Sequence, residues 1–134
     1  MMIRIRTIMG LATAIALAAG TFASAQSAPP AGDPSKGKQV FAICTGCHVL
    51  AGPSFTAPAL AGVVGRKAGT APGFDYTKAL SGSGLVWNAE TLDRFLADPS
   101  KAVPGTAMFS NVPDAQDRAD VIAYLKTVPA QAAP

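Results

Sequence analysis

Both cysteines and the single histidine of this 134-residue chain stand within five consecutive positions. Cys44, Cys47 and His48 form a C-x-x-C-H motif, whose spacing is typical of covalent attachment of a c-type haem. Each thiol would add across one vinyl group of a porphyrin and leave a thioether. Cysteines three positions apart on a helical turn point to the same side. Because His48 directly follows Cys47, its imidazole would lie beneath the iron once the ring is tethered.

The motif has other interpretations. The two cysteines could form a structural disulfide or a thioredoxin-like dithiol, but such a dithiol is expected beside a βαβ unit, which the sequence does not indicate. A structural zinc ion takes four ligands, and the motif offers three candidates. Haem attachment is therefore the interpretation that we favour.

A haem iron takes two axial ligands, and the chain has no second histidine. Methionine is the next candidate, because a thioether sulfur is soft and raises the reduction potential when it is paired with histidine. Outside residues 1–25 the only methionine is Met108, in a segment that also contains proline and glycine. A methionine that merely packs in the core or lies in a turn is the alternative. We expect Met108 to ligate the iron.

The first 25 residues predict export from the cytoplasm. Arg4 and Arg6 form a basic region, residues 8–20 are an apolar stretch, and residues 23–25 read Ala-Ser-Ala, a small-residue cleavage site. We therefore predict a secretory signal peptide that is cleaved after Ala25, and a mature protein that begins at Gln26 in the periplasm. An uncleaved N-terminal anchor is the alternative.

Cleavage would change the charge of the working protein. The formal net charge of +3 includes Arg4 and Arg6, so nine Lys and Arg would remain against eight Asp and Glu, a net charge of +1. A strongly cationic surface for nucleic acid is therefore not supported. Export also places the cysteines in a compartment where disulfides form. Two free thiols would normally oxidise to each other there, but we expect both to be consumed as thioethers.

Three helices are expected around the motif. Asp33 is a favourable N-cap and Pro34 suits the first position of a helix that runs towards Cys44. Further helices are expected over residues 88–97 and about 114–127, from their apolar stripes and capping residues.

The connections between these helices are long. Residues 49–73 are rich in proline and glycine, and so long a loop is uncommon unless it surrounds something. We find no internal repeat and no convincing strand. The predicted fold class is all-α, with a flexible leader over residues 26–32, one domain over residues 33–128 and a disordered tail over residues 129–134.

From about residue 33 to residue 127 the chain resembles the class I cytochromes c, the soluble bacterial and mitochondrial kind. The resemblance lies in Gly37-Lys38-x-x-Phe41, Cys44-x-x-Cys47-His48, Gly62-Val63-Val64-Gly65-Arg66-Lys67-x-Gly69, Pro72-Gly73-Phe74-x-Tyr76-Thr77, Trp87, Glu90-Thr91-Leu92, Val103-Pro104-Gly105-Thr106-x-Met108 and residues 120–126. It implies one all-α domain whose helices and long loops surround a single, covalently bound haem c.

The resemblance also implies roles for individual residues. Met108 would be the sixth iron ligand, and the Pro58 carbonyl would accept a hydrogen bond from the ring of His48. The residues implied to hold a buried haem propionate are Arg66, Tyr76 and Trp87, and those implied to form the pocket wall are Leu60, Phe95 and Leu96. The segment that carries Gly37 and Phe41 would cross the final helix near Val121 and Tyr124.

Some positions depart from the mitochondrial pattern. Ile43, Ser100 and Ala107 stand where lysines of the docking ring usually lie, whereas Lys101 is retained. The loop between His48 and Pro58 is also two residues shorter. Docking through a dense ring of positive charge is therefore not expected.

These observations predict a periplasmic one-electron carrier, not an enzyme, whose haem iron cycles between the ferric and ferrous states. Its expected partners are redox proteins: a respiratory complex, an oxidase or a periplasmic dehydrogenase. We expect a monomer with no small-molecule substrate and no nucleic-acid partner. The alternatives are a dedicated electron-accepting subunit of a periplasmic dehydrogenase, or a haem enzyme or sensor with a labile sixth ligand. Met108 argues against the last of these.

Overall fold

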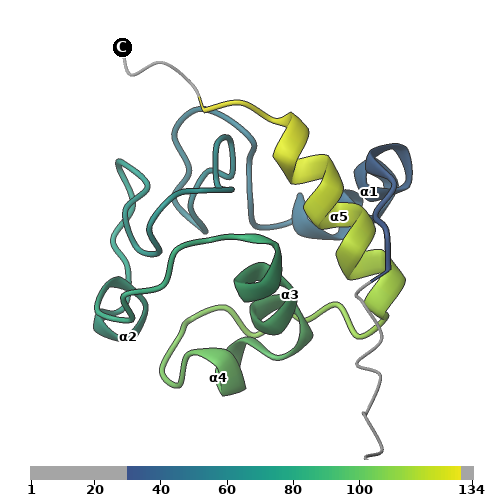
Figure 1. Ribbon diagram of the computed structural model, residues 1–134. Coiled ribbons are helices and arrows are strands. Elements are labelled where there is room, and N and C mark those ends of the chain that lie inside the picture. The colour runs from purple at the N-terminus through teal and green to yellow at the C-terminus, as the bar shows by residue number, and fades with distance from the viewer. Residues whose placement is uncertain (1–29, 131–134) are drawn as a thin grey trace, which may run out of the picture.

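The computed structural model describes residues 30–130. The predicted signal peptide, most of the leader and the end of the tail lie outside the described residues. The elements are α1 (Pro34–Val40), the 3₁₀-helix η1 (Phe41–Cys44), α2 (Lys78–Ser81), α3 (Ala89–Ala97), α4 (Pro99–Ala102) and α5 (Ala115–Thr127) (Figure 1). Within this part of the chain, β pairing is confined to one isolated bridge between Lys67 and Val86. The predicted all-α class is confirmed.

The three helices expected from the sequence begin at their predicted caps. The Asp33 side chain accepts hydrogen bonds from the first turn of α1, with Pro34 at the first helical position. Asn88 and Thr91 form a reciprocal capping box at α3, and Asp114 accepts from the Asp117 amide of α5 at 2.9 Å. Each cap satisfies amide groups that the helix itself leaves unpaired.

Two short helices were not predicted. Pro99 begins α4, which is capped by Asp98 through a 3.0 Å bond from the Lys101 amide. Thr77 caps α2 in the same way, from the Leu80 amide at 3.3 Å. Helices of one turn carry no readable periodicity, so only their caps could have indicated them.

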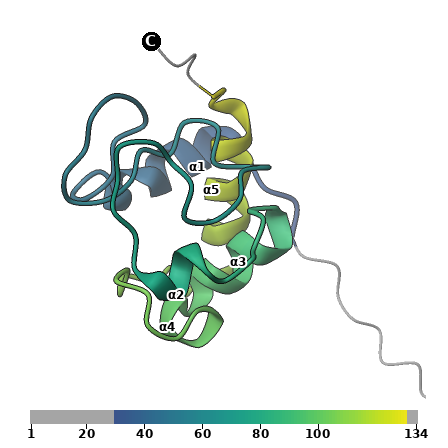
Figure 2. The same ribbon diagram turned by 90° about the vertical axis from the view of Figure 1, so that its left-hand side faces the viewer.

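α1 and α5 cross at a glycine. A Cβ atom on Gly37 would overlap the backbone carbonyl of Asp120, so only glycine allows this approach. Beside the crossing, the rings of Phe41 and Tyr124 pack with their centroids 5.5 Å apart. Both views of the ribbon show α1 running against α5 (Figures 1 and 2). The crossing fixes the start of η1, and hence the C-x-x-C-H motif, against the last helix.

Residues just outside the predicted domain, 33–128, also pack against it. The Gln116 side chain donates to the Ala31 carbonyl at 2.9 Å, and the Asp33 amide donates to Asp120 at 2.7 Å. At the other end, Ala130 packs against Gly62. Residue 31 of the predicted leader and residue 130 of the predicted tail therefore contact the folded domain.

One cluster of buried side chains joins η1, α3, α5 and the loops. Its members are Phe41, Val63, Ala68, Trp87, Leu92, Phe95, Leu96, Val103, Val112, Val121, Ile122 and Leu125. The segment between η1 and α2 forms the large loop region seen beside these helices in Figure 1. No helix among residues 30–130 is long and apolar enough to cross a membrane.

Candidate functional site

The C-x-x-C-H motif adopts a single helical turn at the end of η1. The amides of Cys47 and His48 donate to the Cys44 carbonyl at 3.1 and 2.9 Å. Both cysteines are free thiols; Cys44 is half-buried against the core cluster and Cys47 is exposed. Burial raises the pKa of the Cys44 thiol above its ordinary value. The turn therefore presents two unpaired thiols beside an apolar core.

The ring of His48 is oriented by the backbone of Pro58. The His48 Nδ1 atom lies 2.7 Å from the Pro58 carbonyl oxygen. A carbonyl can only accept, so Nδ1 is the nitrogen that carries the proton and donates. In the neutral ring the lone pair of Nε2 is then left for a metal ion.

The segment that carries Pro58 is held by backbone pairing with residues just after the motif. The Leu60 amide donates to the Val49 carbonyl at 3.0 Å, and the Ala61 amide donates to the Leu50 carbonyl at 2.7 Å. Because residues 49 and 50 directly follow His48, this pairing brings the histidine and its acceptor together.

Arg66 is half-buried and contacts the same segment. Its guanidinium donates to the carbonyls of Ala61 and Ala59, each at 3.0 Å. The sequence did not indicate these two acceptors, because they are backbone atoms of alanines and carry no side-chain signal. Arg66 was assigned to a propionate by resemblance only; that role stays a proposal.

Tyr76 is half-buried in the neighbourhood of Arg66. Burial raises the pKa of the Tyr76 hydroxyl, while the Ala71 backbone and the positive charge of Arg66 act in the opposite direction. The hydroxyl is thus held in its neutral form, in which it can donate a hydrogen bond.

Trp87 and Phe95 lie in the core beside one another, with ring centroids 5.0 Å apart. Leu96 is buried in the same cluster, and Leu60 packs against it. Four of the six residues predicted as pocket wall or propionate support therefore share one apolar region with the Cys44 side chain.

Met108 lies at the end of a turn that follows α4. The Val103 amide donates to the Pro99 carbonyl at 2.9 Å, and the Thr106 amide donates to the Val103 carbonyl at 3.0 Å. The Met108 side chain is half-buried against the core cluster. Its thioether is thus placed at the margin of the apolar region that also contacts Cys44.

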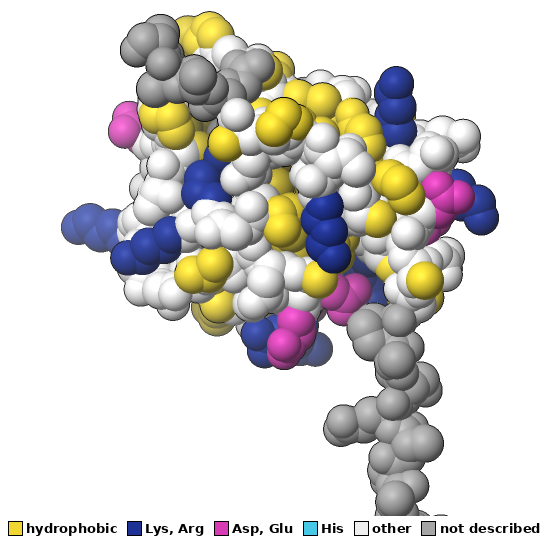
Figure 3. All heavy atoms as spheres, turned by 45° about the horizontal axis from the view of Figure 1, so that its top comes forward, with side chains coloured by type: hydrophobic (Ala, Val, Ile, Leu, Met, Phe, Trp, Pro, Cys, Tyr) yellow, Lys and Arg dark blue, Asp and Glu magenta, His cyan; other side chains and the backbone are white. Residues whose placement is uncertain are grey.

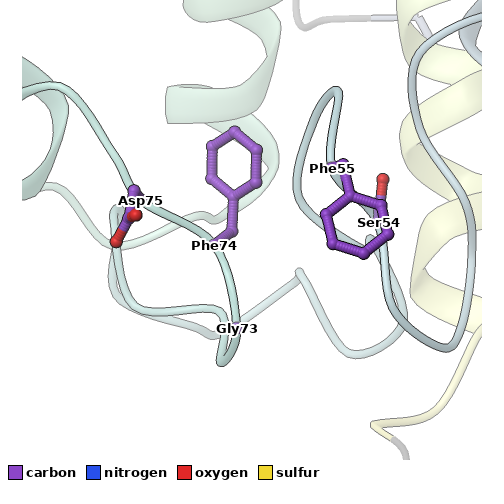
Figure 4. Close-up of a pocket in the computed structure, with 5 residues that line it drawn as sticks. All are labelled: Ser54, Phe55, Gly73, Phe74 and Asp75. Atoms are coloured by element: carbon purple, nitrogen blue, oxygen red, sulfur yellow. The ribbon is translucent and has the colours of Figure 1, made fainter.

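An open cleft of about 200 Å³ borders this region, and its lining residue Phe74 packs edge-on against Tyr76 with ring centroids 5.0 Å apart. It is lined by Ser54, Phe55, Gly73, Phe74 and Asp75, and Figure 4 shows the rings of Phe55 and Phe74 on opposite sides of it. The cleft is smaller than the roughly 300–1,000 Å³ of typical ligand pockets. None of the predicted site residues lines it, so we assign it no role in the site.

The donor set is suited to a c-type haem. Two free thiols can form thioethers, His48 has one nitrogen available for iron, and Met108 supplies a soft thioether. The apolar region formed by Trp87, Phe95 and their neighbours suits the flat face of a porphyrin. Together the fold and the motif define a small all-α protein built to hold a haem through its own chain.

Comparisons with known proteins agree with this class. Residues 34–129 match the Cytochrome c family, and the chain belongs to that family. It is 52% identical to cytochrome c of Tetrahymena pyriformis over 101 residues, which cover 74% of this chain and 92% of that protein. It is 47% identical to cytochrome c2 of Rhodomicrobium vannielii over 117 residues, or 84% of this chain and 93% of that one.

A solved structure is similar as well. The chain resembles cytochrome cH from Methylobacterium extorquens with a TM-score of 0.69 and 46% identity, over 72% of this chain and 99% of that one. Membership of the family implies a covalently bound haem c with its iron, and a role as an electron carrier, not as an enzyme.

Proposed function

We propose that this protein is a periplasmic one-electron carrier with His48 and Met108 as the axial ligands of its iron. The observation that supports this most directly is the 2.7 Å contact between His48 Nδ1 and the Pro58 carbonyl. It fixes the tautomer that leaves Nε2 for the metal, and it makes the ring a more basic ligand.

The bound haem supplies the redox chemistry, and the chain supplies binding, orientation and electrostatics. Cys44 and Cys47 tether the group, whereas Arg66, Tyr76 and Trp87 are the proposed contacts of a propionate. The apolar wall of Leu60, Phe95 and Leu96 disfavours the additional positive charge of the ferric state and so raises the reduction potential.

Export is the second part of the proposal. Residues 1–25 have the pattern of a secretory signal peptide with cleavage after Ala25. The similarity to a bacterial cytochrome c2 accords with a periplasmic protein.

We also propose how the carrier meets its redox partners. Ile43 and Phe109 are exposed by 67% and 87%, and Ala107 is exposed as well. With a mature net charge of only +1, apolar contact through these residues would dominate docking. In Figure 3 the Lys and Arg side chains are spread over the face instead of gathered in one patch.

An optical spectrum of the purified protein, with and without reductant, tests the function. We expect a low-spin, six-coordinate c-type spectrum in both states, with the colour retained on the polypeptide after extraction with acidified acetone. Free porphyrin in the solvent layer would contradict covalent attachment. A high-spin spectrum would favour a haem enzyme or sensor with an open sixth position.

The exposed hydrophobic side chains also suit a permanent subunit of a periplasmic dehydrogenase. The electron transfer would be the same, but the partner would not dissociate. Size-exclusion chromatography of the native periplasmic extract separates the two cases, because a free carrier elutes as a small monomer and a subunit elutes with its enzyme.

A further inference from the structure

The contacts of Arg66 reach the histidine ligand through the backbone. Its two terminal nitrogens donate to the carbonyls of Ala61 and Ala59, each at 3.0 Å. Ala59 directly follows Pro58, whose own carbonyl accepts from His48 at 2.7 Å. One short segment therefore connects the guanidinium to the imidazole.

This segment has four sets of hydrogen bonds, one of which joins the Val63 amide to the Leu60 carbonyl at 3.0 Å. The amides of Leu60 and Ala61 bond to residues 49 and 50, the carbonyls of Ala59 and Ala61 bond to Arg66, and the Pro58 carbonyl bonds to His48. In the described part of the chain, neither of the two alanine carbonyls has another donor. Hydrogen bonds from a charged donor are stronger than neutral ones, so Arg66 provides a large share of what fixes this segment.

The backbone of Arg66 is itself anchored to the buried core. The Trp87 amide donates to the Arg66 carbonyl at 2.9 Å, and the Gly65 amide donates to the Trp87 carbonyl at 2.6 Å. Among residues 30–130, no carboxylate forms an ion pair with Arg66. Its charge is thus directed to the two carbonyls from a fixed position.

We propose that Arg66 is a positioning residue for His48, because its guanidinium holds residues 59–61 so that the Pro58 carbonyl stays on Nδ1. The proposal rests on the ligation of iron by His48 proposed above, and it is separate from any contact of Arg66 with a propionate.

The two roles of Arg66 have opposite effects on the reduction potential. A firm bond from Nδ1 to a carbonyl makes the imidazole more basic, which favours the ferric state. Losing that bond therefore raises the potential. Losing a positive charge near the iron instead favours the ferric state and lowers the potential.

Arg66→Lys separates these effects. Lysine keeps the charge but lacks the planar fork of arginine. In the haem-loaded protein we expect the Nδ1–H of His48, observed by NMR, to exchange with solvent about three- to tenfold faster, the range for weakening of one hydrogen bond. The potential should rise. Lys67→Gln removes the next positive charge, which is exposed and makes no such bonds, and should leave the exchange rate unchanged.

A wild-type exchange rate of the His48 Nδ1–H in Arg66→Lys would overturn the proposal. If the variant does not mature, the wild-type protein still decides. The Nη–H protons of Arg66 should exchange with solvent more slowly than those of Arg94, whose side chain is 62% exposed. Equal rates would show that Arg66 does not hold residues 59–61. If His48 showed no iron-shifted ring resonances in the wild type, the ligation and the positioning role would both fail. Iron-shifted resonances with unchanged exchange in Arg66→Lys would remove the positioning role alone.

Discussion

Gly37 in α1 lies against the backbone carbonyl of Asp120 in α5, with no space for a Cβ atom between them. This contact sets the distance between the first and last helices of the domain. Because η1 and the C-x-x-C-H turn continue directly from α1, the same contact determines where the haem-binding motif stands against the core.

Gly37→Ala should destabilise the protein. The added methyl group overlaps a backbone atom that cannot rotate away, and overpacking of this kind costs about 1–3 kcal/mol. Better helix propensity returns at most about 1 kcal/mol. We expect a lower free energy of unfolding and a lower midpoint in a thermal melt. Gly46→Ala is the matched control, since a Cβ there meets no atom within 4 Å; equal stability of the two variants would contradict the close contact.

Met108→Ala should leave the haem attached but remove its sixth ligand. No other methionine or histidine in residues 26–134 can replace the sulfur. Haem axial ligands set potentials over a range of about 0.8 V, so we expect a clear decrease in the reduction potential and binding of added imidazole. Redox titration and optical spectra measure both. A variant with the wild-type spectrum and potential would show that Met108 is not the ligand.

Asp120→Asn should change how the free energy of unfolding depends on pH in the acid range. The pKa of the buried Asp120 carboxyl is lowered, first by the hydrogen bond from the Asp33 amide and then by that from the Gln116 side chain. A lowered folded-state pKa stabilises the protein above the unfolded value, about 3.9, and this contribution is lost as the pH falls through the folded value.

The wild type should thus be more stable than Asp120→Asn at pH 7, and the difference should shrink below about pH 4. Unfolding in denaturant at several pH values measures it. Asp117→Asn, which removes an exposed carboxylate from the same helix, controls for the loss of charge. A stability difference between the wild type and Asp120→Asn that stays constant as the pH falls to the acid transition would contradict this prediction.

Electron transfer with the physiological partner should depend weakly on salt. Steered association reaches about 10⁸–10⁹ M⁻¹s⁻¹ at low salt and falls steeply with ionic strength, whereas unsteered docking is roughly 10⁵–10⁶ M⁻¹s⁻¹. We expect little change as the Debye length shortens from about 30 to 8 Å. A steep decrease would instead assign recognition to the exposed lysines Lys36, Lys38, Lys67, Lys78 and Lys101.

The mature protein should begin at Gln26. The intact mass of the periplasmic product should correspond to loss of residues 1–25 and gain of one haem, because Ala23-Ser24-Ala25 follows the apolar run. A full-length species in the membrane fraction would support an uncleaved anchor.

Much of this protein could be predicted from the sequence because the relevant signals are local. The C-x-x-C-H spacing and the caps Asp33, Asn88 and Asp114 all act over a few residues. Caps satisfy amides within one turn, so their side chains can be recognised without tertiary information. The all-α class and the three longer helices followed from them.

Only the tertiary structure assigned the contacts that use backbone carbonyls as acceptors or close neighbours. The acceptors of Arg66 are carbonyls of Ala59 and Ala61, and any residue at these positions would offer the same atoms. The resemblance implied that Gly37 lies against the last helix, but the atom that it meets, the Asp120 carbonyl more than 80 residues away, came only from the structure. Main-chain acceptors and close helix approaches depend on how the chain packs, because a backbone carbonyl is identical in every residue.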